Sequence, residues 1–402
     1  MKRRYSFLAL GIVLMLTTSG LAWATGSVEE SAPESGARPG PGEIGTLIET
    51  GNPISSVARY ATGFSAVENG DLTIVTVGRP WQAATADDAL SYVLYPRSAT
   101  RPEVDGAAAV IPVPIDSIVT MSTTFLAHLK ALDRLDSLVA VDSVAFAYEP
   151  EVHAMYDAGE LLEVGSGPGV DVEQLLALDA DVIMVNSYGG EWDAQPALEQ
   201  AGLPAVVSGD WVENAPLGRA EWLLFTALLF DELDEASDLF AEIEREYTRL
   251  TSVARRVQDD PSVLINTPYQ GTWSISGGAS YAARFIEDAG GAYVWSDDES
   301  TGALFLDIET VYAEAGDADV WINPGAWTSL AQGAAEDDRF TEFRAFREGR
   351  VYNNNRRMGP GGGNDYFESG ALNPHIILND LIWVFHPELV SDYEPYYYQQ
   401  LQ

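Results

Sequence analysis

The sequence predicts an α/β protein with two lobes, each built on a mainly parallel sheet, joined by a single long backbone helix. Strand, loop and helix patterns alternate on both sides of the middle of the chain, which is typical of parallel sheets with helical crossovers. Between these halves, no glycine or proline occurs between Gly218 and Pro261, although the chain has 36 glycines and 21 prolines. The 402 residues, of which 46% are hydrophobic, are enough for two cores.

The first 24 residues have the pattern of a signal peptide. Basic residues at positions 2–4 precede an apolar run over 7–16, and the sequence AWA at 22–24 is a small-x-small cleavage pattern. A membrane anchor is the alternative, and it is less well supported because the apolar run is short for a bilayer. Residues 25–45 are rich in Gly, Pro, Ser and Glu, so we expect a disordered tether there.

The chain contains no cysteine, which excludes a disulfide scaffold and predicts that there is no lipobox cysteine for a lipid anchor. Together with the signal peptide, this predicts a periplasmic or otherwise extracytoplasmic protein. The formal net charge of −39 makes nucleic acid an unsuitable partner, because phosphate binding needs a basic face. The acidity fits either a saline habitat or an acidic docking face, and the even spread of the acids favours the first.

The N-terminal lobe is expected over residues 46–230. It starts with an extra β-hairpin, predicted from short alternating runs around the Asn69-Gly70 turn. Strands are then predicted at 117–121, 138–144, 181–185 and 203–209, with a helix after the Ser122-Thr123-Thr124 cap and another at 171–178.

The backbone helix is expected over residues 231–260. Apolar side chains recur there at spacings of mostly three and four, which gives one apolar stripe. Within this segment, a helix from 234 to 257 spans roughly 36 Å at 1.5 Å per residue and can cross from one lobe to the other. An ordinary crossover helix within one lobe is the alternative. The C-terminal lobe is expected over 261–402, where the strand and helix alternation resumes.

Several motifs in this order resemble a known family. They are VDVEQLLALDADVIMV, SISGGASYAARFIEDAGGAYVW and LDIETVYAEAGDADVWI, within a match from about 111 to 390. Together they resemble the substrate-binding proteins of ABC importers for iron-siderophores, haem and cobalamin, a periplasmic-binding-protein-like family. The resemblance implies a monomer that binds a small-molecule metal chelate between two lobes, has no cofactor or catalytic residue, and docks on the transmembrane subunits of an ABC permease. Residues 46–110 are not part of the family's common core.

The resemblance also assigns two permease-docking residues. Glu173 and Glu309 each lie at the start of a short helix that precedes a strand, one in each lobe. In the family, one surface glutamate per lobe meets arginines on the permease subunits, and such rim charges aid orientation and association rate. The alternative is that both acids only stabilise the helix macrodipole.

Ligand contacts are expected on loops at the carboxyl ends of strands, where parallel sheets place their binding sites. Aromatic side chains on such loops suit a flat or conjugated ligand, although each could instead anchor its loop into a core. The candidates are Ser122, Thr123, Tyr148, Tyr188, Trp211, Tyr269, Trp273 and Trp327. Arg356 and Arg357 are added as a cationic pair for an anionic chelate, with ion pairing to neighbouring acids as the alternative. Arg219 begins the central segment, where a place at the hinge edge of the cleft is one interpretation and a structural role is the favoured one.

Other functions are less well supported by the sequence. Direct binding of bare transition-metal ions needs converging ligands, and His128, His153, His375 and His386 fall on or near predicted helices rather than on the expected site loops. We therefore expect no metal bound directly by the protein. A secreted hydrolase would need a Gly-x-Ser-x-Gly element, which is missing. A surface interaction module without transport function stays open as an alternative.

Overall fold

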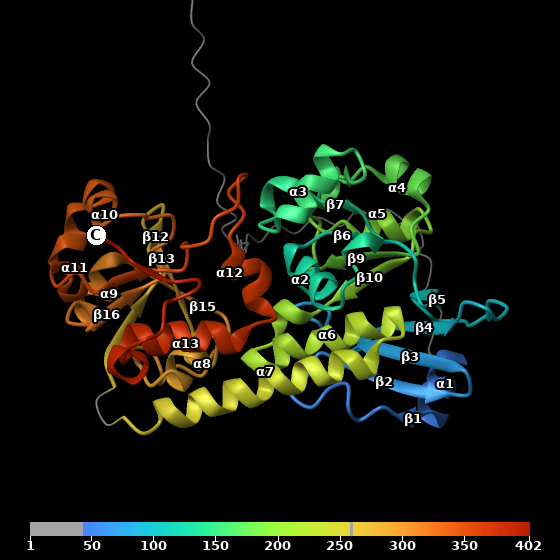
Figure 1. Ribbon diagram of the computed structural model, residues 1–402, viewed down its shortest axis with the longest axis horizontal. Helices are drawn as coiled ribbons and strands as arrows, with labels where there is room; N and C mark the ends of the chain where they lie inside the picture. The colour runs from blue at the N-terminus through green and yellow to red at the C-terminus, as the bar shows by residue number, and fades with distance from the viewer. Residues whose placement is uncertain (1–42, 258–259) are drawn as a thin grey trace, which may run out of the picture. The chain divides into compact units, whose positions relative to one another are not determined.

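The computed structural model describes residues 43–257 and 260–402, so the predicted signal peptide lies outside the described residues. Four sheets are present in this part of the chain: two five-stranded sheets rich in parallel pairs, one largely antiparallel five-stranded sheet and one three-stranded antiparallel sheet (Figure 1). The architecture is therefore mixed α/β, as predicted. No helix in these ranges combines the length and the apolar character that crossing a bilayer requires.

The first described elements are helix α1 (Glu43–Thr50) and a five-stranded sheet. Helix α1 starts inside the segment predicted to be a tether, residues 25–45. The strands are β1 (Asn52–Pro53), β2 (Phe64–Asn69), β3 (Leu72–Val77), β4 (Leu90–Pro96) and β5 (Ala109–Val113). The predicted hairpin is the β2–β3 pair, which turns at Gly70 with a φ of 62°. The sequence predicted only this hairpin, whereas the structure extends it with β4 and β5 into a full sheet.

Alternation along the strands gives this sheet two apolar faces. Ile74 and Val93 point to the side that α1 covers with Ile44. Phe64 points to the other side, where its ring lies 4.7 Å from the ring of Trp222 on helix α6 (Pro216–Phe230). The sheet is thus a layer between α1 and α6, in contact with the main core.

Two buried carboxylates also join this sheet to the rest of the protein. Glu213 accepts hydrogen bonds from the backbone N–H groups of Thr62 and Gly63, and Glu221 on α6 accepts two from Tyr60 and Ala61. All four N···O distances are 2.7–2.8 Å. Because buried charge is stable only with such partners, the segment before β2 is held firmly against α6.

The first parallel sheet has the strand order β10-β9-β6-β7-β8, and all its pairs are parallel. Its strands are β6 (Ile118–Thr120), β7 (Leu138–Val141), β8 (Leu162–Glu163), β9 (Val182–Asn186) and β10 (Ala205–Ser208). The helices between them are α2 (Thr123–Ala131), α3 (Pro150–Asp157), α4 (Val172–Leu178) and α5 (Gln195–Gln200). Parallel pairing brings the carboxyl ends of the strands, and the loops that follow them, to one edge.

Two helices separate the lobes in sequence. Helix α6 ends at Asp231, which has a left-handed φ of 59°, and helix α7 (Leu233–Ala254) follows directly. Figure 1 shows the two helices side by side. The long helix is shorter than the predicted 231–260 and has 22 residues, or roughly 33 Å at 1.5 Å per residue.

Helix α7 contacts both halves of the protein from its middle. Glu244 accepts hydrogen bonds from Arg59 and Tyr60 in the N-terminal segment. Further on, the hydroxyl of Tyr247 donates to Asp288 of helix α8 over 2.8 Å. The helix therefore contacts both halves of the protein, as the prediction of a connecting strut requires.

The C-terminal lobe combines two sheets. The first has the order β14-β11-β16-β17-β18 and is parallel except for its last strand. The strands are β11 (Ser262–Ile265), β14 (Ala292–Tyr293), β16 (Val320–Ile322), β17 (Val351–Asn353) and β18 (Gln399–Gln400), and the small second sheet has β12 (Pro268–Tyr269), β13 (Thr272–Ser276) and β15 (Ala303–Leu306). The helices are α8 (Tyr281–Asp288), α9 (Ile308–Ala315), α10 (Leu330–Glu336), α11 (Arg344–Arg347), α12 (Asp365–Glu368) and α13 (Pro374–Phe385).

Candidate functional site

The loop after β9 is organised by one buried carboxylate, that of Asp193. It accepts hydrogen bonds from the hydroxyl of Ser187 and from the backbone N–H groups of Tyr188, Gly189 and Gly190, over 2.7–3.2 Å. Several charge-assisted bonds to one short loop fix its shape. The side chain of Tyr188 is left 55% exposed at the carboxyl end of the sheet, where sequence reasoning expected a ligand contact.

Tyr188 and Trp211, both predicted as ligand contacts, lie together. Their ring centroids are 5.0 Å apart, although the two residues come from the loops after different strands, β9 and β10. The indole N–H of Trp211 is buried and has no hydrogen-bond partner in the described part of the protein. Two further buried polar atoms at strand ends also lack partners there, on Thr120 and Asn186. Such atoms are uncommon in protein interiors, so this edge has unused capacity for polar contacts.

A charged pair lies beside these rings. Asp210 is buried, and its carboxylate is 3.5 Å from Nε of Arg219, at the start of α6. The guanidinium of Arg219 also lies 5.4 Å from the ring centroid of Tyr281, which belongs to α8 in the C-terminal lobe. Burial would lower the pKa of Arg219, but Asp210 and Tyr281 more than offset this effect, and the pKa is raised. Arg219 is therefore a cation placed between the lobes, which corresponds to the less favoured of the two interpretations that the sequence offered for it.

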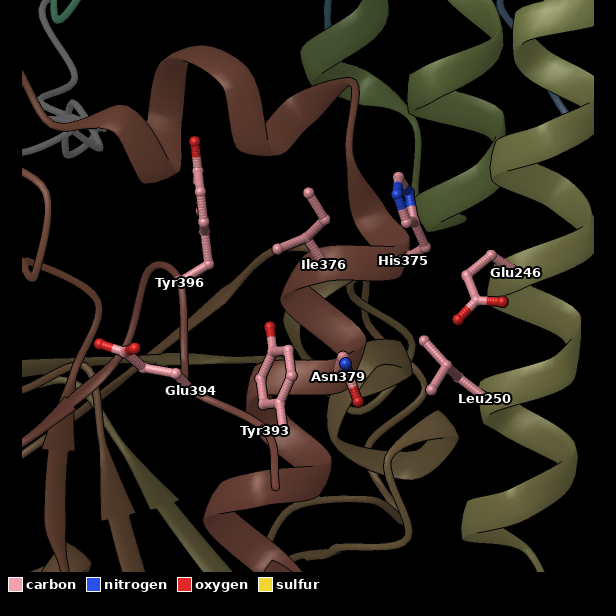
Figure 2. Close-up of a pocket in the computed structure, with 8 residues that line it drawn as sticks. All are labelled: Glu246, Leu250, His375, Ile376, Asn379, Tyr393, Glu394 and Tyr396. Carbon is pink, nitrogen blue, oxygen red and sulfur yellow. The ribbon is translucent and has the colours of Figure 1, made fainter. Parts of the chain in front are cut away.

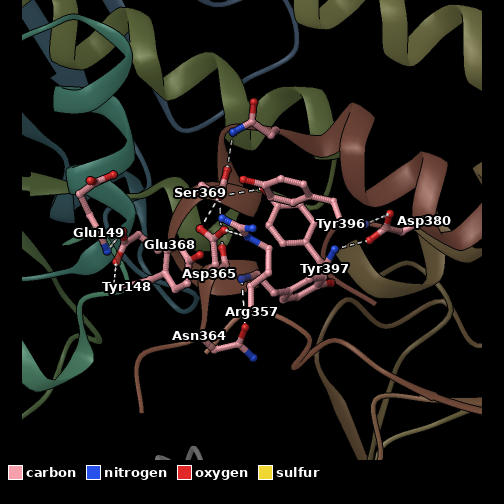
Figure 3. Close-up of polar contacts among 12 residues, drawn as sticks. Tyr148, Glu149, Arg357, Asn364, Asp365, Glu368, Ser369, Asp380, Tyr396 and Tyr397 are labelled. Atoms are coloured by element: carbon pink, nitrogen blue, oxygen red, sulfur yellow. Dashed lines mark hydrogen bonds and ion pairs between the residues drawn. The ribbon is translucent and has the colours of Figure 1, made fainter. Parts of the chain in front are cut away.

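Arg357 joins the lobes at a second point, shown in Figure 3. Its guanidinium carbon lies 4.8 Å from the ring centroid of Tyr148 in the N-terminal lobe and 4.0 Å from that of Tyr396. Its Nε donates to Asp365 over 2.6 Å. Arg356 pairs with Glu394. Each arginine is thus engaged by a neighbouring acid, which is the alternative to the cationic pair proposed from the sequence.

Glu368 on α12 provides the closest polar link between the lobes. Its carboxylate accepts from the backbone N–H groups of Tyr148 and Glu149, over 2.6 Å and 2.9 Å (Figure 3). Burial raises the pKa of Glu368 to about 7. Beside it, a Cβ added to Gly361 would lie 2.5 Å from the carbonyl oxygen of Ala145, so only glycine allows this approach of the two backbones.

Three further residues predicted as ligand contacts are Ser122, Thr123 and Tyr269. Ser122 and Thr123 lie at the start of α2, and this helix packs against α12. The hydroxyl of Ser122 is 3.0 Å from that of Thr124. Tyr269 is half exposed on the β12–β13 hairpin, and no hydrogen bond or ring contact joins it to the residues above in the described structure.

Trp273 and Trp327 do not line a surface. Trp273 is fully buried and Trp327 is 3% exposed. Both belong to an aromatic cluster with Trp321, Phe340 and Phe343, in which ring centroids are 5.2–6.0 Å apart. Their indole N–H groups already donate to a backbone carbonyl and to a glutamate. The prediction of these two tryptophans as ligand contacts conflicts with this packing, and they form core instead.

The two glutamates predicted to dock on a permease have equivalent local structures. Asp171 caps helix α4 by accepting from the N–H of Gln174, and Asp307 caps α9 by accepting from Thr310. Glu173 and Glu309 are each two residues after their capping aspartate and are exposed. Beside Glu309 is a hollow of about 260 Å³ with mainly apolar walls, lined by Ile308, Glu309, Tyr312, Arg339, Glu342 and Phe343.

A second hollow, of about 210 Å³, lies between α7, α13 and the C-terminal segment, and no sequence prediction pointed to it. Figure 2 shows Glu246 and Leu250 on α7 and His375, Ile376 and Asn379 on α13 around it. The other walls are Tyr393, Glu394 and Tyr396. Within residues 43–257 and 260–402, no group of three or more His, Cys, Asp or Glu side chains is arranged to hold a metal ion.

Comparison with known proteins gives a consistent picture. The family model described as "Periplasmic binding protein" matches residues 118–356. An uncharacterized lipoprotein of Methanocaldococcus jannaschii is 24% identical over 408 residues, covering 95% of this chain and 93% of the relative. Another uncharacterized lipoprotein of that organism is 26% identical over 329 residues, covering 77% and 79%.

Solved structures share the fold at low sequence identity. A substrate-binding protein of an ABC transporter from Listeria monocytogenes has a TM-score of 0.52 at 18% identity, covering 68% of this chain and 99% of its own. A protein of an ABC-type Fe³⁺-hydroxamate transport system from Saccharomonospora viridis has a TM-score of 0.51 at 18% identity, covering 68% and 94%. A periplasmic haem-binding protein from Roseiflexus has a TM-score of 0.50 at 19% identity, covering 68% and 99%.

The names of the relatives contradict the predicted localisation. The sequence led us to expect an extracytoplasmic protein with no lipobox cysteine, yet both Methanocaldococcus proteins are named lipoproteins. The observation behind the prediction, a chain of 402 residues without cysteine, is unchanged. Since relatives over most of this chain carry the name of lipid-anchored proteins, the prediction that there is no lipobox anchor is withdrawn.

Proposed function

Because this chain belongs to the periplasmic binding protein family, we propose that it captures a metal chelate and delivers it to an ABC permease. A ferric siderophore is the first candidate ligand, followed by haem and cobalamin. Members of this family bind substrates for transport, so the chain is a binding protein and not an enzyme. The ligand and the delivery step are the parts that we propose.

One arrangement carries the proposal: the exposed Tyr188 ring against Trp211, next to the Arg219–Asp210 pair and to Tyr281 of the opposite lobe. Aromatic faces offer a large contact area with little loss of side-chain entropy, which suits a flat or conjugated chelate. A guanidinium beside them suits the oxygen atoms of an anionic chelate. The solved relatives named for Fe³⁺-hydroxamate and haem support the same ligand class.

The test is equilibrium dialysis of the purified protein against a ferric hydroxamate, haemin and cyanocobalamin, with Zn²⁺ and Mn²⁺ as bare-ion controls. We expect saturable binding of one chelate and none of the bare ions. Tyr188→Ala should weaken that binding by about tenfold, or roughly 1.4 kcal/mol, because it removes one face of the aromatic pair. Tyr156→Ala is the matched control, since Tyr156 is an exposed tyrosine on α3 of the same lobe. Binding of none of the chelates would reject the proposal.

Delivery is proposed to use Glu173 and Glu309 as docking points for basic residues of the permease subunits. The equivalent capped helices in the two lobes support this role, because they present one exposed carboxylate each in the same local geometry. Charged groups at the rim of an interface mainly orient the partners and speed their association. Substitution of these residues should therefore leave chelate affinity unchanged.

A further inference from the structure

Residues 79–82 link the N-terminal sheet to the loops of the ligand site; we call them the strap. The strap follows β3. Its first residue, Arg79, donates from Nη2 to the carbonyl of Val212 over 2.6 Å. The carbonyl oxygen of Arg79 lies only 2.6 Å from the place that a Cβ on Gly209 would take. The strap thus lies directly on the loop that carries Trp211.

Trp81 makes the corresponding contact with the loop that carries Tyr188. Its indole Nε1 lies 2.6 Å from the place that a Cβ on Gly189 would take. Gly189 also has a φ of 75°, a backbone conformation that favours glycine. Both site loops therefore have a glycine where the strap covers them, and any larger residue there would displace the strap.

The next residue reaches the opposite lobe. Nε2 of Gln82 donates to the hydroxyl of Thr301 over 3.2 Å. Thr301 lies in a segment that is itself fixed to the C-terminal lobe, because the carbonyl of Ser300 accepts from the N–H of Ala279 over 3.0 Å. Arg79, Trp81 and Gln82 together thus contact both loops of the aromatic pair and the other half of the protein.

We propose that the strap is a positioning element of the ligand site: Arg79 and Trp81 hold the Tyr188–Trp211 pair in place, and Gln82 links the two lobes. The strap precedes the part of the chain that the family model matches, residues 118–356. A feature outside that region therefore adjusts both ligand affinity and the separation of the lobes. The effect on ligand affinity depends on the proposed function, whereas the link between the lobes does not.

The lobe separation can be measured without any ligand. The absence of cysteine allows spin labels to be placed at Glu160→Cys and Asp317→Cys, which are exposed positions in opposite lobes. Pulsed electron–electron double resonance then gives the distribution of distances between the two spin labels. We expect Gln82→Ala and Trp81→Ala to broaden this distribution. Gln200→Ala, at an exposed glutamine on α5, should leave it unchanged. Identical distributions for the wild type and Gln82→Ala would reject the link.

The positioning role is tested by the affinity for the chelate that the wild type binds. Trp81→Ala should weaken binding by about tenfold, whereas Trp81→Phe, which keeps a ring over Gly189, should stay within about threefold. Gly189→Ala should behave like Trp81→Ala, because its Cβ displaces the indole. Equal thermal stability of the variants separates positioning from unfolding. Unchanged affinity in both Trp81→Ala and Gly189→Ala would overturn this role. If the wild type binds none of the chelates, the proposed function fails, and the distance measurement still decides the link.

Discussion

The starts of helices α4 and α9 are built from the same local sequence pattern but have different surroundings. Each has a capping aspartate, an aliphatic residue, an exposed glutamate and an exposed apolar residue three positions later, Leu176 in one lobe and Tyr312 in the other. Glu309 pairs with Arg339 over 2.9 Å. For the carboxylate of Glu173, the described structure contains no hydrogen bond or ion pair.

The difference shows what local sequence determines and what it leaves to the fold. The cap and the helix start depend on neighbours in sequence, so both lobes have them. The orientation of the glutamate depends on Arg339, which lies 30 residues further along the chain and is itself held by Asp337. We therefore expect Glu309 to be a more fixed docking point than Glu173, although exposed pairs of this kind contribute little to stability.

Charge reversal should produce the largest effect. Glu309→Lys should weaken association with the permease by at least about a hundredfold, because it replaces attraction by repulsion and faces Arg339 as well. Glu173→Lys should also weaken association with the permease, but by a smaller factor. The measurement is binding of the loaded protein to membranes of the source organism. Glu160→Lys, an exposed residue elsewhere, controls for net charge. An equal loss in that control would show that the two glutamates have no special role.

Glu368, which links the two lobes, should make the stability of the protein depend on pH. Its pKa is raised to about 7, first by burial and further by Asp365 and Glu149, against about 4.3 in an unfolded chain. The neutral form is thus favoured in the folded protein, and this contribution to stability is present below pH 4 and lost as the pH rises through about 7. The free energy of unfolding should fall by about 2 kcal/mol from pH 5 to pH 8 because of this group.

Glu368→Gln tests that pH dependence. The variant cannot ionise, so its thermal stability should change less between pH 5 and pH 8 than that of the wild type. Glu160→Gln is the exposed control and should follow the wild type. Parallel pH profiles for Glu368→Gln and the wild type would show that the link between the lobes does not titrate in this range.

The apolar residues three positions after the glutamates allow a finer comparison. Tyr312→Ala removes a wall of the hollow beside Glu309 and an edge-to-face contact with Phe343, whose ring centroid is 5.1 Å away. We expect it to weaken permease association about fivefold, as the loss of one partly exposed aromatic contact does. Leu176→Ala should have less effect. The two variants are compared in the same membrane-binding assay, and a larger effect of Leu176→Ala would contradict the ranking of the two lobes.

The smallest effect is expected at the caps. Asp171→Ala removes the acceptor for Gln174 and should lower the free energy of unfolding by about 1 kcal/mol. Asp307→Ala should act in the same direction. The N–H of Thr310 lowers the pKa of Asp307. The cap therefore persists until the pH falls below the range in which an ordinary aspartate becomes protonated. Denaturant unfolding checks both variants, and Asp171→Asn, which retains an acceptor, should recover most of the loss.

Much of the fold could be predicted because its signals are local. The glycine- and proline-free run after Gly218 indicated the helices that became α6 and α7, and the Asn69-Gly70 turn indicated the β2–β3 hairpin. The parallel β4–β5 pair could not be predicted, since its partners are brought together by contacts with α1 and α6 rather than by a turn.

The site was predicted less well, because position along the chain does not say which way a side chain points. Tyr188 and Trp273 were both placed on loops at strand ends, yet Tyr188 is exposed and Trp273, which lies inside β13, is part of an aromatic core. Arg219 was assigned a structural role from its place at the start of a helix. Its neighbours Asp210 and Tyr281 are distant from each other in sequence, so only the folded chain brings them together.

The two carboxylates that hold the N-terminal sheet have a consequence for dissecting this protein. A fragment without residues 43–113 would keep Glu213 and Glu221, but the backbone N–H groups that neutralise them would be gone. It would also expose Trp222, which is fully covered in the intact chain. An apolar surface that loses its cover in this way favours aggregation over folding. The region that the family model matches, residues 118–356, is therefore not a module that can be cut out and studied alone.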